Sequence, residues 1–204
     1  MNSEGNDIPH NVSAVILAGG NSSRLGRDKA LVNICNSSSI IHTIVSKLQV
    51  ISDDVIIATN GKKYAGLGVR LTSDIYLNNG PLAGLHSGLL AAKHSHALVV
   101  ACDMPFLNVE LLNYMVSQPL DYDALVPKIE GCLEPLHAIY SRQCITEIER
   151  MLKANRFRTY ELLDTILVQY LLQDTIAMFD PEYRSFFNIN SPKTLKEAIN
   201  LAKE

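Results

Sequence analysis

The chain has 204 residues, of which 47% are hydrophobic and 19% are charged, and its formal net charge is −3. This balance predicts one sizeable domain with a buried core, and it excludes a general nucleic-acid-binding surface because no Lys/Arg-rich run is present. No apolar run reaches the roughly eighteen residues that a membrane span needs. Residues 1–11 are polar and lack the apolar centre of a signal peptide. We therefore expect a flexible tail over 1–11, a domain over 12–204 and a cytoplasmic location.

The cysteines argue against a disulfide framework or a zinc site. They form no C-x-x-C pair, and no histidine lies at ligand spacing from such a pair. We predict reduced, mostly buried thiols at Cys35, Cys102, Cys132 and Cys144.

Short apolar runs alternate along the chain with stretches of helical periodicity. Strands are predicted at 13–18, 55–58, 69–72, 97–101, 124–126 and 136–140, with an edge strand at 176–179. Helices are predicted after Ser39 as N-cap, around 82–90, 111–116 and 145–152, over 159–170, and after Ser191-Pro192. This order predicts an α/β fold, a single-domain three-layer α/β/α sandwich with a mostly parallel, Rossmann-like sheet. Ligands of such sheets bind beyond the carboxyl ends of the strands.

The most informative stretch is 15–29, V-I-L-A-G-G-N-S-S-R-L-G-R-D-K. Gly19 and Gly20 leave backbone N–H groups open to a ligand, and Arg24 and Lys29 add positive charge, so a phosphate chain is the expected occupant. The loop is not a Walker loop, because its last glycine is not followed by Lys-Ser/Thr. It also lacks the G-x-G-x-x-G alternation of a dinucleotide-binding turn. The alternative is an ordinary strand-to-helix turn with solvated charges.

Two further carboxylates follow predicted strands. Asp103, in C-D-M-P-F, is a hard oxygen ligand of the kind that Mg²⁺ requires beside phosphates. It could instead only cap the helix that starts near Asn108 or the turn at Pro105. Asp74 precedes Gly80 in G-P-L-A-G, a segment that fits either a helix N-terminus approached by ligand or a tight loop.

Together with E-P-L-H-A-I-Y and F-F-N-I-N-S-P, these motifs resemble, in the same order, those of the MobA-like nucleotidyltransferases related to molybdenum cofactor guanylyltransferase. The resemblance covers about 12–202. It implies a fold of the nucleotide-diphospho-sugar transferase type. It also implies transfer of GMP from GTP to the terminal phosphate of molybdopterin (molybdenum) cofactor, with Mg²⁺, giving the guanine dinucleotide and pyrophosphate. It leaves open which protein delivers the pterin and which molybdoenzyme receives the product.

The motifs and the resemblance together assign roles to individual residues. The assigned catalytic residues are Arg24, Lys29 and Asp103, with Asp103 also the metal ligand. The expected nucleotide contacts are Leu17, Ala18, Gly19, Gly20, Lys29, Asn60, Asp74, Gly80 and Asp103, and the expected pterin-side contacts are Asn188 and Asn190.

Several alternatives stay open at this stage. Asn188 and Asn190 could be turn residues before a helix cap, and His137 is expected to be a satisfied, half-buried histidine rather than a catalyst. The protein could be a cytidylyl- or other nucleotidyltransferase of the same fold, or a non-catalytic nucleotide-binding protein. Asp74 favours GTP, because a carboxylate can accept hydrogen bonds from the adjacent N1–H and amine of guanine, whereas cytosine has no such pair of donors.

Overall fold

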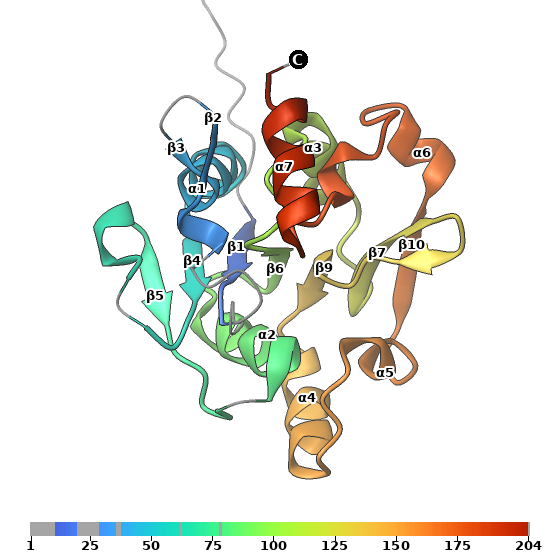
Figure 1. Ribbon diagram of the computed structural model, residues 1–204. Helices are drawn as coiled ribbons and strands as arrows, with labels where there is room; N and C mark the ends of the chain where they lie inside the picture. The colour runs from blue at the N-terminus through green and yellow to red at the C-terminus, as the bar shows by residue number, and fades with distance from the viewer. Residues whose placement is uncertain (1–10, 20–28, 36–37, 62, 78, 204) are drawn as a thin grey trace, which may run out of the picture.

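The structure is a computed structural model that describes residues 11–19, 29–35, 38–61, 63–77 and 79–203. Its centre is an eight-stranded sheet with the order β10-β7-β9-β6-β1-β4-β5 and with β8 paired to β7 (Figure 1). The strands are β1 (Val12–Leu17), β4 (Val55–Ala58), β5 (Arg70–Thr72), β6 (His96–Ala101), β7 (Ala124–Ile129), β8 (Cys132–Leu133), β9 (His137–Ser141) and β10 (Val168–Leu172). A separate two-stranded sheet pairs β2 (Asn33–Cys35) with β3 (Ser38–Ser39).

Most of the large sheet is parallel, as the alternation of strands and helices predicts. Strand β1 lies parallel between β4 and β6, and β10 lies parallel to β7. Strand β9 runs antiparallel to both of its neighbours, β6 and β7. The carboxyl ends of β1, β4, β5 and β6 therefore meet at one edge, where ligands bind in sheets of this kind.

Helices cover both faces of the sheet (Figure 1). The α-helices are α1 (Ile40–Ile51), α2 (Gly80–Ala91), α3 (Val109–Ser117), α4 (Cys144–Lys153), α5 (Thr159–Leu163), α6 (Gln173–Ala177) and α7 (Pro192–Leu201). Helices α1, α3 and α7 pack on one face and α2, α4 and α5 on the other. Because strand side chains alternate, Ile16 of β1 enters the first of these cores and its neighbour Val15 enters the second.

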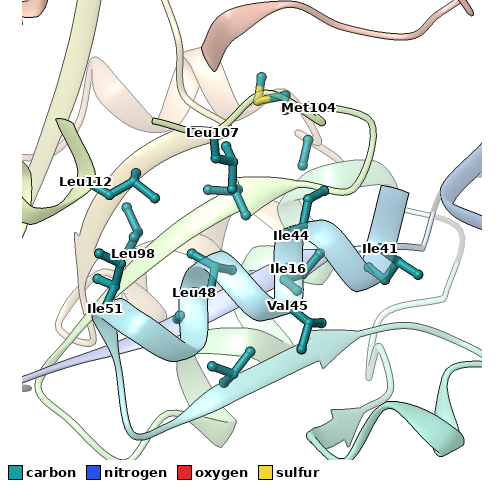
Figure 2. Packing of buried hydrophobic residues seen from close by; sticks show 14 of the residues in the cluster. Ile16, Ile41, Ile44, Val45, Leu48, Ile51, Leu98, Met104, Leu107 and Leu112 are labelled. Carbon is teal, nitrogen blue, oxygen red and sulfur yellow. The ribbon is translucent and has the colours of Figure 1, made fainter. Parts of the chain in front are cut away.

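The core under α1 explains why this helix forms where its periodicity predicts. Ile44 and Leu48 lie on one stripe of α1 and are fully buried against Ile16 of β1 and Leu98 of β6 (Figure 2). Each such side chain contributes about 1.5–3 kcal/mol through burial. Ser39 precedes α1 as predicted, but its hydroxyl pairs with His42 Nδ1 at 2.7 Å and makes no capping bond.

Helix α2 lies unusually close to β1. A Cβ built on Gly88 of α2 would come within 2.4 Å of Cγ1 of Val15, a distance that no side chain tolerates. Glycine at this position therefore allows α2 to approach the sheet, and this close approach places the start of α2 at the edge where the strands end.

The opposite end of the sheet is held by a buried carboxylate, Asp54. It accepts hydrogen bonds from Ser13 Oγ at 2.6 Å, from the backbone N–H of Lys93 at 2.9 Å and from Arg70 Nε at 3.0 Å. Burial alone raises the pKa of Asp54, but the bonds from Ser13, Lys93 and Arg70 outweigh it and hold the pKa below its usual value. One side chain thus joins the start of β1 and β5 to the end of α2.

The sequence patterns misplace two elements. The helix predicted over 159–170 is α5, which ends at Leu163, and the chain then forms β10. Asp123, just before β7, explains this, because its carboxylate and its N–H both bond to the backbone of Leu167 and start the parallel pairing. The edge strand predicted over 176–179 is wrong, because Ile176 lies in α6. The predicted start of α7 is confirmed, with a capping box between Ser191 and Thr194.

Two predictions from composition can be compared with the described residues. Of the cysteines whose side chains are described, Cys144 is buried, Cys102 is partly exposed and Cys132 is exposed, so the prediction of mostly buried cysteines is wrong. Among the described residues, no helix combines the length and apolar character needed to cross a membrane.

Candidate active site

A cleft of about 480 Å³ opens at the edge of the sheet where β1, β4, β5 and β6 end. Six of the predicted site residues come together in its wall: Leu17, Gly19, Asn60, Asp74, Gly80 and Asp103. Pro81, Gly84, Ala101, Cys102 and Leu136 complete the lining. The prediction that residues following separate strands converge in one crevice is therefore confirmed.

Asn60 and Ser87 hold the side chain of Asp74 in the wall of the cleft. Asn60 Nδ2 donates to Asp74 Oδ2 at 2.9 Å, and the N–H of Asp74 donates back to Asn60 Oδ1 at 2.9 Å. Ser87 Oγ, from α2, lies 3.0 Å from Asp74 Oδ1 and 3.1 Å from the backbone oxygens of Ala83 and Gly84, and these acceptors share its one hydrogen. Because an ionised carboxylate has about four acceptor positions, one on each oxygen remains for a ligand. This arrangement can receive two adjacent donors.

Small residues keep the cleft open beside Asp74. A Cβ on Gly84 would lie 3.3 Å from Leu17 Cδ2, and a Cβ on Gly19 would lie 3.4 Å from Asp74 Oδ2. Gly80 begins α2 with φ +67°, a left-handed conformation that glycine adopts without strain. Of the two interpretations of G-P-L-A-G, the structure favours a helix N-terminus that opens onto a ligand cleft.

Asp103 follows β6 and is partly exposed. The alternative that it caps the next helix is wrong, because Asn108 is the N-cap of α3 and its Oδ1 accepts from the N–H of Leu111 at 2.9 Å. Within the described part of the chain, no group of three or more His, Cys, Asp or Glu side chains could enclose a metal. Mg²⁺ fits such a site, because it is commonly held by one or two carboxylates, with water and substrate phosphates as its other ligands.

Other predicted residues lie away from the lining or outside the description. Gly20 and Arg24 fall outside the described residues, and Lys29 starts the 3₁₀ helix η1 (Lys29–Leu31), but its side chain is not described. Ala18 is buried, and its N–H donates to Ala58 O at 2.9 Å, so Ala18 extends the pairing of β1 with β4.

The two predicted pterin-side residues do not line the cleft, but their segment touches it. The N–H of Ile189, which lies between Asn188 and Asn190, donates to the backbone oxygen of Asp103 at 3.0 Å. Asn188 Nδ2 donates to Phe186 O at 3.0 Å, and Asn190 is exposed before the cap of α7. The structure therefore places the segment of both asparagines against the backbone of Asp103, with neither side chain in the lining of the cleft.

His137 differs from its expected environment. It is fully buried rather than half-buried, and its ring lies 4.6 Å from the ring of Phe186. Neither of its ring nitrogens has a hydrogen-bond partner among the described residues. Burial lowers its pKa to about 4, although Asp180 opposes this shift. His137 is therefore neutral near pH 7, has no exposed surface and is not among the residues that line the cleft, which argues against a catalytic role.

Ser87 and Leu136 are residues of the site that the patterns do not reveal. Ser87 lies in mid-helix and is buried, and nothing nearby in the sequence indicates its partner Asp74. Leu136 belongs to E-P-L-H-A-I-Y, a motif that could have suggested a place at the cleft.

Similarity to known proteins agrees with this geometry. The family model described as the MobA-like NTP transferase domain matches residues 14–166. The chain belongs to this family. It is 38% identical over 194 residues to a probable molybdenum cofactor guanylyltransferase of Pelotomaculum thermopropionicum, covering 94% of this chain and 93% of that protein. It is 32% identical to a molybdenum cofactor guanylyltransferase of Desulfosudis oleivorans, covering 92% of this chain and 94% of that protein.

Solved structures share the fold of this MobA-like protein. The crystal structure of molybdopterin-guanine dinucleotide biosynthesis protein A from Archaeoglobus fulgidus has a TM-score of 0.82 and 28% identity, covering 94% of this chain and 99% of that one. A 2-C-methyl-D-erythritol 4-phosphate cytidylyltransferase from Thermus thermophilus has a TM-score of 0.70 and 17% identity, covering 95% of this chain and 100% of that one. The latter likeness concerns the fold alone. The MobA-like family and the α/β architecture make this chain a nucleotidyltransferase.

Proposed function

We propose that this protein transfers GMP from GTP to the terminal phosphate of molybdopterin cofactor and releases pyrophosphate. The relatives named as guanylyltransferases support this reaction. The observation that carries the choice of base is the Asp74 carboxylate, which Asn60 and Ser87 hold at the cleft with one acceptor position free on each oxygen. These positions suit the N1–H and amine of guanine.

The chemistry needs positioning rather than a strong base. The acceptor phosphate is already largely anionic near neutral pH, so its oxygen can attack the α-phosphorus of GTP while the bond to the bridging oxygen breaks and pyrophosphate leaves. Gly19 and Gly20 are proposed to contact the nucleotide through backbone N–H groups, and Arg24 and Lys29 to balance phosphate charge. Asp103 is proposed to hold Mg²⁺, which would neutralise phosphate oxygens when bound.

The order of the strands suggests where each substrate lies. Asn60 and Asp74 follow β4 and β5 at one side of the sheet, Gly19 follows β1, and Asp103 follows β6. A donor nucleotide with its base at Asp74 would place its phosphates near Asp103. The acceptor would then approach from the side of β9 and β7, where the segment with Asn188 and Asn190 contacts Asp103.

The decisive experiment supplies the purified protein with Mg²⁺, molybdenum cofactor and each of the four nucleoside triphosphates, and identifies the dinucleotide by mass spectrometry. We expect the guanine product, with GTP preferred roughly 1,000-fold or more over CTP, because cytosine lacks the second adjacent donor and would leave one of the two remaining acceptor positions of Asp74 unfilled. Asp74→Ala should remove most of this preference. Asp53→Ala is the matched control, since Asp53 is an exposed carboxylate at the opposite end of the sheet.

Two results would contradict the proposal in different ways. A cytosine dinucleotide would overturn the choice of base and leave the nucleotidyltransferase assignment intact. No product with any triphosphate would favour a protein that binds nucleotides without catalysis.

A further inference from the structure

Two segments meet beside the cleft and need a fixed relative position. One is the connection from β6 to α3, which carries Asp103. The other is 179–190, which ends at the two asparagines proposed to face the acceptor. Their direct contacts include the bond from Ile189 N–H to Asp103 O at 3.0 Å, a long bond from Ser185 Oγ to Phe106 O at 3.4 Å and an edge-on approach of the Phe106 and Phe187 rings at 5.9 Å. These contacts touch the seven-residue connection 102–108 at Asp103 and Phe106, and a further link lies at Asn108, where the connection ends.

We propose that Asn108 is a positioning residue that holds segment 179–190 against the Asp103 segment, and so sets where the acceptor substrate lies relative to Asp103. This inference rests on the proposed function. Asn108 is the last residue of the Asp103 connection, and it bonds to segment 179–190 at two points. Its Nδ2 donates to Phe179 O at 2.9 Å and its backbone N–H donates to Ser185 Oγ at 3.0 Å, while its Oδ1 caps α3.

The far side of this link is rigid. The carboxylate of Asp180 is buried and accepts from the N–H groups of Arg184 at 3.0 Å and Ser185 at 2.8 Å. Ser185 is itself fully buried. These bonds close the turn from Asp180 to Ser185. A displacement of Phe179 or Ser185 is therefore passed on to the residues that follow, up to Asn190.

The near side of the link is also anchored. Lys47 Nζ, from α1, donates to the backbone oxygen of Leu107 at 2.7 Å, directly before Asn108. Burial lowers the pKa of Lys47. The chain at Asn108 is thus bonded to α1 through Leu107 and to segment 179–190 through Asn108, whose side-chain amide supplies one of these bonds.

The chemistry of asparagine allows the cap and the link to be separated. Asn108→Asp keeps an acceptor for the N–H of Leu111, and Asp is as good an N-cap as Asn. It loses the donor to Phe179 O and places a carboxylate oxygen next to that carbonyl oxygen, so the two acceptors repel each other. Asn108→Ser also keeps a cap and loses the amide donor to Phe179 O, without added charge. The matched control is Gln118→Glu, which removes an amide donor to Tyr114 O at the other end of α3.

The test measures steady-state kinetics with GTP and molybdenum cofactor, GTP affinity by calorimetry, and amide hydrogen exchange over 179–190. Loss of one hydrogen bond of about 1.4 kcal/mol corresponds to a ten-fold effect. We therefore expect both Asn108 variants to raise the KM for the acceptor roughly ten-fold and to speed exchange in 179–190. GTP affinity should change less than about two-fold, and Gln118→Glu should match the parent.

Each other outcome argues against the inference. An unchanged acceptor KM in active variants would overturn it. So would a rise in the acceptor KM matched by an equal loss of GTP affinity and by a lower melting temperature, since this combination indicates general destabilisation. If the parent protein forms no guanine dinucleotide, the proposed function fails and the inference fails with it. Product from the parent together with parent-like variants refutes the inference alone.

Discussion

Gly88→Ala tests the idea that close packing of α2 on β1 shapes the cleft. The new Cβ would lie 2.4 Å from Val15 Cγ1 and 3.2 Å from Val15 Cγ2. Val15 is fully buried in β1, which is paired on both sides, so the strand cannot retreat. Since carbon atoms settle at about 3.5–4.0 Å, α2 must move outward by roughly 1 Å or the valine must leave its rotamer.

The expected cost is the difference between two effects. Alanine in a helix interior is favoured over glycine by up to about 1 kcal/mol. Overpacking a well-filled core costs about 1–3 kcal/mol, and the 2.4 Å contact belongs at the upper end. The free energy of unfolding should therefore fall by about 2 kcal/mol. For a chain of this size, that lowers the melting temperature by about 4–8 °C.

Urea and thermal unfolding of Gly88→Ala, Val15→Ala and the double variant measure this effect. Val15→Ala alone should cost about 2 kcal/mol through lost burial. In the double variant the new methyl group occupies the space left by valine, so the loss should be about 2 kcal/mol less than the sum of the single losses. Gly66→Ala is the control, since a Cβ there has no neighbour within 4 Å. GTP affinity of Gly88→Ala should also fall, because moving α2 stretches the bond from Ser87 to Asp74.

Additive losses, within about 0.5 kcal/mol, would refute this reasoning, because they would mean that the two side chains do not compete for the same space. Parent-like stability of Gly88→Ala would show that α2 adjusts without cost.

Three further outcomes are expected. Asp103→Asn should lower turnover by orders of magnitude at saturating Mg²⁺ and leave the melting temperature nearly unchanged, since it removes the charge that a metal needs; a full-rate variant would refute the metal role. His137→Leu should keep or raise the free energy of unfolding at pH 7.5. Between pH 6.5 and 4 the histidine of the parent is protonated only in the unfolded state, which lowers the free energy of unfolding by up to about 3 kcal/mol, and the variant should lack this decrease. An unchanged pH profile would contradict this. The pKa of Asp54 is lowered in the folded protein, so its carboxylate stabilises the fold above about pH 4, and this stabilisation is lost as the pH falls through the lowered pKa. Asp54→Asn should therefore lower the free energy of unfolding at pH 7 and remove this part of its decrease in acid. Urea titrations at several pH values measure both effects.

Local patterns were sufficient for much of this fold. The apolar run before Gly19, the run that ends before Asp103 and the stripe of α1 each lie within about a dozen residues, and each forms the predicted element. These patterns predict the folded elements correctly because the apolar residues of each pattern form the face that is buried in the core. The position of Asp74 after β5 followed in the same way from its place in the chain.

Other elements depended on pairing that no local pattern contains. Residues 168–172 form a strand because β7 offers an edge and Asp123 bonds to Leu167, whereas the same residues alone continue a helical periodicity. The antiparallel direction of β9 likewise depends on the path that the chain takes from β7.

The sequence by itself determined which chemistry this protein carries: a glycine-rich loop, a carboxylate after the central strand β6 and the motifs of a nucleotidyltransferase family. Only the tertiary structure decided how those groups are held. Ser87 meets Asp74 across 13 residues, and Asn108 meets Phe179 across 71. Residue type and local spacing are written in the chain, but such contacts arise only when the register of the sheet and the depth of the helices bring distant segments within hydrogen-bonding distance.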